Sequence, residues 1–173
     1  MSSTLQRARL RLSKARQVEI FRRSGWLCRW CRRPVVFPAA LKYMQKELEN
    51  AGYNNLAHWR PAYHRQGAPL LDELAAVVDH VRPFAAGGLC NEDNFVTACN
   101  RCNMRKNASD PASWERKHPI RVIKGKFGEP EDWDGLSNVF LLLAKRGPES
   151  LTQSEKEWLA ALDKRSPSYL SRD

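Results

Sequence analysis

Apolar residues recur at helical spacing close to the N-terminus of the chain. They are Leu10, Leu12, Val18, Ile20 and Phe21. This periodicity predicts a helix over residues 4–23, or a shorter helix over residues 14–23 with Ser13 as its N-cap. Gly25 suits the left-handed conformation that commonly ends a helix. The first predicted element is therefore an amphipathic helix followed by a tight turn.

The centre of the chain changes from a helical pattern to short apolar runs. Pro38 can open a helix that continues to about Asn50 with one apolar face. The segments "LAAVVDHV" at residues 74–81 and "NFVTA" at residues 94–98 predict two strands, because each is a short apolar run bounded by loop residues. The segment "NRCNMRKNAS" at residues 100–109 then begins a helix. We therefore predict the order strand, loop, strand, helix.

Two further helices are predicted near the C-terminus. Residues 136–146 form a strongly apolar segment that needs a packing partner. The segment "TQSE" from Thr152 to Glu155 matches a capping box, which opens a final helix. The buried side of that helix is expected to carry Trp158, Leu159 and Leu162. We expect residues 127–173 to form a helical hairpin that packs on the core or mediates dimerisation.

The net charge of +10 is distributed unevenly. Residues 1–33 hold ten Lys/Arg and one acid, and residues 101–126 hold eight Lys/Arg and two acids. Residues 34–100 and 127–173 are slightly acidic. Such clustering suits a phosphate backbone, because basic side chains that neutralise phosphates release condensed counterions. The charge favours a nucleic-acid partner, with a solvated basic face as the alternative.

Four of the five cysteines form two Cys-x-x-Cys pairs. These pairs are "CRWC", with Cys28 and Cys31, and "CNRC", with Cys99 and Cys102. In an intracellular chain, two such pairs indicate a structural zinc site rather than disulfides. Two thiolates from each pair would complete a tetrahedral shell with no open position for catalysis. The fifth cysteine, Cys90, is expected to be a small, partly buried residue, and no role is assigned to it.

The region between the two pairs is longer than the usual gap of a zinc ribbon, so residues 34–73 are interpreted as an insertion. A surface or packing role is expected for His58 and His64, since neither has a spaced metal-binding partner. Trp26 and Trp30 flank the first pair and are expected to shield the metal, with stacking on a base as the alternative. The candidate surface for reading base sequence comprises Tyr53, His58, Trp59, Arg60, Tyr63, His64 and Arg65.

No apolar run reaches the length of a membrane span, and the N-terminus lacks the apolar region of a secretory signal. These features predict a cytoplasmic, intracellular protein of bacterial or phage type. No membrane partner is expected.

Asp79 and His80 adjoin at the end of a predicted strand. Side chains alternate between the faces of a regular strand, so the pair can share one site only if the strand ends or twists there. Pro83 and the long loop after it favour such an ending. Asn103 directly follows Cys102, so the zinc site would fix its position. The Asp79 carboxylate and the Asn103 amide are oxygen donors, which suit Mg²⁺ or Mn²⁺ rather than a second zinc.

The stretch "VVDHVRPFAAGG…NEDNFVTACNRCNMRK" resembles the signature of the HNH endonucleases. The shared pattern is a DH pair, a glycine-containing loop, an asparagine, and a knuckle followed by His or Asn. The upstream "CRWC" resembles the first knuckle of the family's four-cysteine zinc subgroup, so the resemblance covers roughly residues 14–110. It implies an α+β fold, with a small zinc-stabilised, treble-clef-like ββα-metal core and additional N-terminal, inserted and C-terminal helices. Residues 1–126 would be the nuclease domain and residues 127–173 a helical appendage.

The resemblance also implies a role for each matched residue. His80 resembles the general base, and Asn94 matches the asparagine that braces the loop orienting this base. Asp79 and Asn103 resemble the ligands of the catalytic metal, with Asn107 a weaker substitute for Asn103. Because the family more often has His at the position of Asn103, the asparagine favours Mg²⁺ or Mn²⁺ over catalytic zinc. The expected products carry 5′-phosphate and 3′-hydroxyl ends.

Basic residues on the predicted helix after the second knuckle are candidate nucleic-acid contacts. They are Arg101, Arg105 and Lys106. Their alternative interpretation is a set of solvated helix charges.

The sequence therefore predicts a metal-dependent endonuclease that nicks or cuts DNA. One alternative is a non-catalytic, zinc-stabilised module that binds nucleic acid. Another is a homodimer or a subunit of a larger restriction or phage-defence complex. The residues Asp79, His80, Asn94 and Asn103 favour the enzyme, because a binding module needs only the cysteines and a basic surface.

Overall fold

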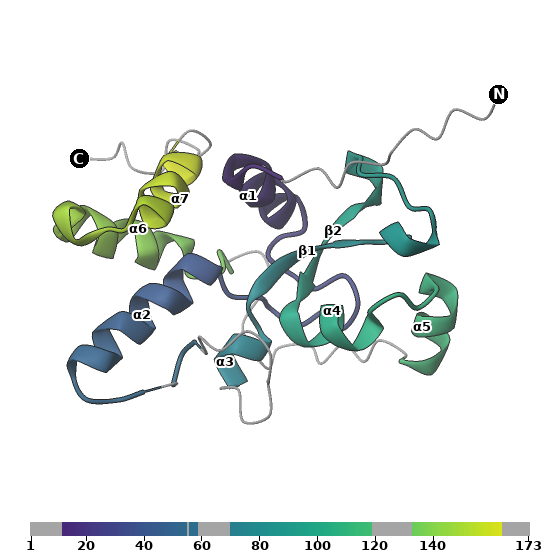
Figure 1. Cartoon of the computed structure of the whole chain (residues 1–173), viewed down its shortest axis with the longest axis horizontal. Helices are drawn as coiled ribbons and strands as arrows, with labels where there is room; N and C mark the ends of the chain where they lie inside the picture. Colours follow the sequence, from purple (N-terminus) through teal and green to yellow (C-terminus); the bar gives the residue numbers. More distant parts are fainter. Residues whose placement is uncertain (1–11, 55, 59–69, 119–132, 164–173) are drawn as a thin grey trace.

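A computed structural model of the chain describes residues 12–54, 56–58, 70–118 and 133–163. A two-stranded antiparallel sheet lies at the centre, with helices on both sides of it (Figure 1). The strands are β1 (Ala76–His80) and β2 (Phe95–Cys99). The helices are α1 (Lys14–Arg23), α2 (Pro38–Asn50), α3 (Leu70–Glu73), α4 (Asn100–Lys106), α5 (Pro111–Lys117), α6 (Ser137–Arg146) and α7 (Gln153–Asp163).

The core that carries the candidate site is a ββα unit. Strand β1 pairs with β2 so that Asp79 lies opposite Val96 and His80 opposite Phe95. Helix α4 begins immediately after β2, and the Cys99 sulfur accepts a hydrogen bond from the backbone N–H of Cys102 at its first turn. The predicted order of strand, loop, strand and helix is confirmed. The chain has the predicted mixed fold, a ββα core with a four-cysteine cluster beside it and extra helices, which is consistent with the predicted zinc-stabilised core.

Helix α1 covers residues 14–23, the shorter of the two predicted ranges. The Ser13 hydroxyl accepts a hydrogen bond from the backbone N–H of Arg16, as an N-cap does. Gly25 has a φ of 61°, in the left-handed region that favours glycine. Residues 4–11 of the longer predicted helix lie outside the described residues. The cap and the glycine explain why the chain turns directly from α1 into the first knuckle.

The inserted region is anchored by one buried polar side chain. Gln45 on α2 is 1% exposed, and its Oε1 accepts hydrogen bonds from the backbone N–H groups of Ala57 and His58. Nδ1 of His58 lies 2.8 Å from Oδ1 of the buried Asp72 carboxylate, a polar contact that ties the inserted region to α3. Tyr53 is exposed. The other residues of the candidate base-reading surface, Trp59, Arg60, Tyr63, His64 and Arg65, lie outside the described residues.

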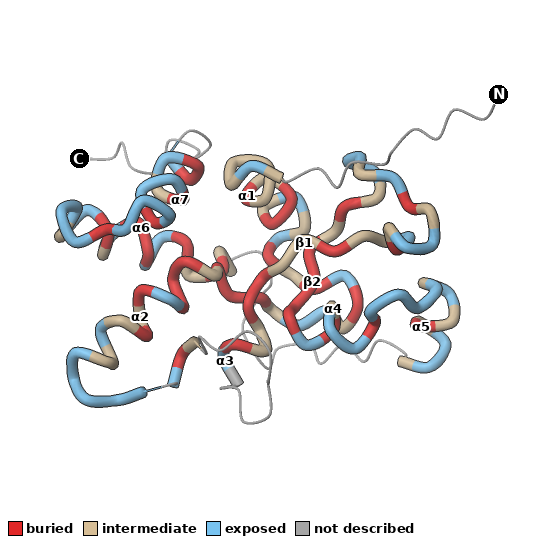
Figure 2. The backbone as a smooth tube through the Cα atoms, viewed as in Figure 1, coloured by how far each residue is buried: buried red, intermediate tan, exposed pale blue. Residues whose placement is uncertain are grey.

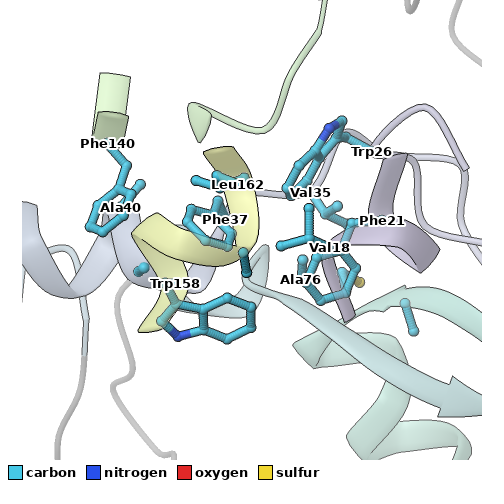
Figure 3. Packing of buried hydrophobic residues seen from close by; sticks show 14 of the residues in the cluster. Val18, Phe21, Trp26, Val35, Phe37, Ala40, Ala76, Phe140, Trp158 and Leu162 are labelled. Carbon is cyan, nitrogen blue, oxygen red and sulfur yellow. The ribbon is translucent and has the colours of Figure 1, made fainter. Parts of the chain in front are cut away.

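The two C-terminal helices pack on the rest of the molecule. Phe37 makes edge-to-face contacts with Phe140 of α6 and Trp158 of α7, at centroid distances of 5.5 and 5.1 Å (Figure 3). The Thr152 hydroxyl and the Glu155 carboxylate form the predicted capping box at the start of α7. Buried residues recur along these helices and along the central strands (Figure 2). Within the described residues, every helix is too short or too polar to span a bilayer.

Candidate active site

Four cysteines from two distant parts of the chain meet beside the sheet. The sulfur atoms of Cys28, Cys31, Cys99 and Cys102 all lie within 4.8 Å of one another. The Cys31 and Cys99 sulfurs are 3.9 Å apart, so these residues are free thiols rather than a disulfide. Three of the four residues are buried and Cys31 is half-buried. The first knuckle and the start of α4 thus contribute equally to one compact group of sulfur ligands.

The ionisation of these thiols is strongly linked. Hydrogen bonds from Cys102 and Cys28 hold the pKa of Cys31 far below its usual range. The pKa of Cys102 is raised well above its usual range, because its thiol proton is shared with Cys28 and Cys31. Thiolates are the form in which cysteines bind a metal ion, and these four sulfur atoms lie together in a largely buried place. Four sulfur ligands at this spacing fit a closed, structural Zn²⁺ site.

Trp30 connects this cysteine cluster to the end of β1. It lies between Cys28 and Cys31 in the sequence and is 2% exposed. Its indole N–H donates a hydrogen bond of 2.8 Å to the Asp79 carboxylate. Its ring face contacts the Lys106 ammonium, which lies 4.8 Å from the ring centroid. Trp30 is therefore an interior residue, and its buried face is not available to stack on a base.

The Asp79 carboxylate is held by protein donors on both of its oxygens. Oδ2 accepts from the Trp30 indole and lies 3.3 Å from the Lys106 ammonium. Oδ1 accepts from the backbone N–H of His80 at 2.8 Å. Asp79 is 8% exposed, so these interactions replace most of its contact with water. A carboxylate can accept about four hydrogen bonds, which leaves room for one further ligand.

Lys106 corrects one prediction made from the sequence. Its side chain is 0% exposed and does not lie on the outer face of α4 with the predicted nucleic-acid contacts. The ammonium donates to the backbone carbonyl of His80 at 3.0 Å and offsets the charge of Asp79. The physical reason is that α4 packs on β1 with its last turn over the strand end. Arg101 and Arg105 are exposed, although Arg101 also pairs with Glu73 at 3.1 Å.

A cleft of about 830 Å³ runs past the end of β1 and one face of α4. The predicted site residues that line it are Asp79, His80, Asn103 and Asn107. The structure thus brings the predicted base and the predicted oxygen ligands to one cavity. Phe84 and Met104 contribute apolar surface to the same cleft.

The His80 ring is held by aromatic and sulfur contacts. Its centroid lies 5.0 Å from that of Phe95, the residue opposite it on β2, and 6.3 Å from that of Phe84. Its Nε2 lies 3.5 Å from the sulfur of Cys90. The ring is therefore positioned from the strand side and from the loop that follows β1.

Asn94 closes the loop between the two strands. Its Oδ1 accepts from the backbone N–H of Arg82 at 2.8 Å, and its Nδ2 donates to the carbonyls of Arg82 and Leu89 at 3.0 and 2.8 Å. A Cβ at Gly88 would lie 1.9 Å from the Arg82 carbonyl oxygen and 2.8 Å from Asn94 Nδ2. Only glycine fits at position 88 while this side chain spans the loop. Asn94 does not line the cleft but shapes the segment beside it.

Comparison with known protein families gives a result that agrees with this geometry. The model of the HNH endonuclease family matches residues 67–109. The chain carries an HNH endonuclease domain. The match to the HNH domain includes β1, the loop closed by Asn94, β2 and α4, and therefore every predicted residue of the cleft. No curated protein and no solved structure shows detectable similarity to the chain.

Three residues contact Asp79 or His80 in the structure, although the sequence did not predict these contacts. They are Trp30, Lys106 and Cys90. A signal exists for Lys106, because it follows the buried Cys102 by four residues and so shares its helix face. The contacts of Trp30 and Cys90 join segments far apart in the sequence or across a loop, and no periodicity indicates them.

Proposed function

We propose that the chain is a metal-dependent endonuclease that hydrolyses phosphodiester bonds of DNA, by nicking or by double-strand cleavage. The observation that supports this most strongly is the meeting of His80, Asp79 and Asn103 at one cleft within the segment that matches the HNH endonucleases. HNH nucleases act on DNA, and the basic charge beside the knuckles suits that partner.

In the proposed reaction, the His80 imidazole takes the proton from a water molecule as its oxygen attacks the scissile phosphorus. The phosphorus–oxygen bond to the 3′ oxygen breaks as the new bond forms, and the leaving 3′ oxygen takes up a proton from water. The products then carry 5′-phosphate and 3′-hydroxyl ends. Asn94 supports this step indirectly, because its hydrogen bonds to Arg82 and Leu89 fix the loop beside the His80 ring.

Asp79 and Asn103 are the residues proposed to hold Mg²⁺ or Mn²⁺. Their carboxylate and amide oxygens are the donor type that these ions prefer. The bound ion would offset the negative charge that develops on the phosphoryl group and on the leaving 3′ oxygen. The Asp79 carboxylate accepts from three protein donors and can accept about one ligand more. The metal ion would bind to this remaining lone pair.

Arg101 and Arg105 are the proposed contacts to the DNA backbone. Both are exposed on the first two turns of α4, the helix that also carries Asn103. Guanidinium groups bind phosphate oxygens with paired donors, so these residues can position a duplex against the cleft. Such contacts would give affinity without sequence preference.

A second candidate function is a zinc-stabilised module that binds nucleic acid without cutting it. The observation that favours it is the enclosure of Asp79 by Trp30, Lys106 and the His80 N–H. These donors give the carboxylate a structural role that requires no metal. The two functions differ in one respect that can be measured, the cleavage of bound DNA.

Incubation with supercoiled plasmid tests the proposal. Zinc-loaded protein with Mg²⁺ or Mn²⁺ should convert the plasmid to open-circular or linear forms, and EDTA should stop the conversion. DNA ligase should reseal nicked product without prior treatment, since the proposed ends are ligatable. Protein that shifts plasmid on a gel yet never cleaves it, with any divalent ion, would establish the binding module instead.

A further inference from the structure

Cys90 is the cysteine that the zinc cluster does not use. It lies in the loop between β1 and β2, is half-buried, and has its sulfur 3.5 Å from Nε2 of His80. This distance is within the range of a hydrogen bond to sulfur, whose radius is larger than that of oxygen. The one cysteine outside the zinc cluster thus contacts the proposed base.

The position of Cys90 is fixed from both sides by Asn94. The carbonyl of Leu89, the residue before it, accepts from Asn94 Nδ2 at 2.8 Å. The side chain of Asn91, the residue after it, accepts from the Asn94 backbone N–H at 3.2 Å. These bonds hold the backbone on either side of Cys90 in place beside His80. The Cys90 sulfur is the atom of this loop that contacts the His80 imidazole.

A neutral imidazole carries its proton on one nitrogen and a lone pair on the other. His80 lines the cleft, whereas Cys90 is not among the residues that line it. The nitrogen that faces Cys90 is therefore suited to carry the proton, and the other nitrogen to accept one from water. A hydrogen-bond acceptor beside Nε2 favours the form that carries the proton on Nε2.

We propose that Cys90 is a positioning residue that accepts a hydrogen bond from Nε2–H of His80 and so keeps the lone pair on Nδ1, ready to take a proton from water. This inference rests on the proposed function of His80 as the base. It assigns to Asn94 and Cys90 one shared task, in which the asparagine fixes the loop and the thiol fixes the ring.

The tautomer of His80 tests the inference without any measurement of cleavage. The chain has four histidines, so ring ¹⁵N shifts of the zinc-loaded protein can be assigned with a His80→Gln variant. At a pH at which the ring is neutral, His80 should be in the Nε2–H form, and Cys90→Ala should give a mixture of both forms. An Nδ1–H form in the unaltered protein, or an unchanged tautomer in Cys90→Ala, would overturn the proposal.

Kinetics give a second test that separates a positioning role from a structural one. Cys90→Ala should lower kcat about tenfold, the value of one modest hydrogen bond, with KM unchanged. Cys90→Ser, which retains an acceptor, should recover part of this loss. Equal kcat in Cys90→Ala and the unaltered protein would contradict the proposal. If neither protein cleaves DNA, the proposed function fails, and the tautomer measurement still decides the role of Cys90.

Chemical modification completes the test. Iodoacetamide should alkylate Cys90 in the zinc-loaded protein, as located by mass spectrometry, and should lower the cleavage rate in proportion to the modified fraction. The Cys90→Ser variant, which lacks this thiol, should keep its own rate after the same treatment. Full alkylation at Cys90 with an unaltered rate would show that the sulfur has no part in holding the base.

Discussion

The Lys106 side chain is buried beside the end of β1. Its ammonium meets the Asp79 carboxylate, the His80 carbonyl and the face of Trp30. Together these contacts fasten the last turn of α4 to the end of β1 and to the first knuckle. The Lys106 ammonium therefore holds the Asp79 carboxylate and the backbone carbonyl of His80 in place before any ligand binds.

Removal of one member of this pair should destabilise the fold. Lys106→Met leaves the buried Asp79 carboxylate without its counter-charge, which should cost about 3 kcal/mol of unfolding free energy. Urea denaturation of the zinc-loaded protein measures this loss. Arg105→Met, an exposed change on the same helix, is the matched control and should cost little.

A double variant isolates the charge from the packing. Asp79→Asn combined with Lys106→Met removes both charges and should recover much of the stability lost in Lys106→Met alone. If Lys106→Met is as stable as Arg105→Met, the ammonium does not support the end of β1.

Among the elements, those with a local signal could be predicted from the sequence. Ser13, Pro38 and the "TQSE" capping box each mark a helix start by a residue type with a defined backbone or hydrogen-bonding role. Helix α5 had a signal of the same kind that the prediction did not use. Asp110 is its N-cap and accepts from the Ser113 N–H, and Pro111 occupies its first turn.

Other features of the elements depend on tertiary contact and have no local signal. The backbone of Val36 forms a parallel bridge with Ala75, and the Phe37 N–H donates to the Gly135 carbonyl at 2.7 Å. These bonds join the start of the inserted region to β1 and to the segment before α6. No periodicity specifies such pairings, because each depends on where distant segments come to rest.

The capping box of α7 gives a prediction at the element scale. The Thr152 hydroxyl accepts from the Glu155 N–H and donates to its carboxylate. Thr152→Ala removes this cap and should lower the unfolding free energy by about 1 kcal/mol. Chemical denaturation monitored by far-UV circular dichroism measures the change. Thr152→Ser keeps the hydroxyl and should remain near the stability of the unaltered chain, and equal stability of Thr152→Ala and Thr152→Ser would show that the cap contributes nothing.

For the molecule as a whole, the sequence predicted a four-cysteine cluster and a candidate site at the DH pair, but not how the two are joined. The two cysteine pairs and the DH pair are strong signals of chemistry, since few other arrangements need these residue types at this spacing. The link between them runs from the Trp30 indole to Asp79 and requires the first knuckle to pack against β1. The division into a nuclease domain and an appendage stays a prediction, and Phe37, Phe140 and Trp158 belong to one hydrophobic cluster that spans it.

Zinc should therefore stabilise the whole molecule rather than the knuckle alone. Cys28, Cys99 and Cys102 belong to the same hydrophobic cluster as the helices. Cys99→Ser should release bound zinc and unfold the chain, because structural zinc binding supplies folding free energy. Metal analysis and circular dichroism measure the two effects. Cys90→Ser, the matched change outside the cluster, should keep its zinc, and a folded, zinc-free protein of unaltered sequence would refute the metal site.

The most direct test of the central claim compares DNA cleavage with DNA binding in His80→Ala. His118→Ala, a half-buried histidine outside the cleft, is the control. Under single-turnover conditions with Mg²⁺ or Mn²⁺, His80→Ala should cleave at least about a hundredfold more slowly than the unaltered protein, the usual loss of a general base. Its affinity for the same DNA, measured by fluorescence anisotropy without divalent ions, should be unchanged. Cleavage by His80→Ala at the rate of the His118→Ala control would contradict the claim that His80 is the base of a nuclease.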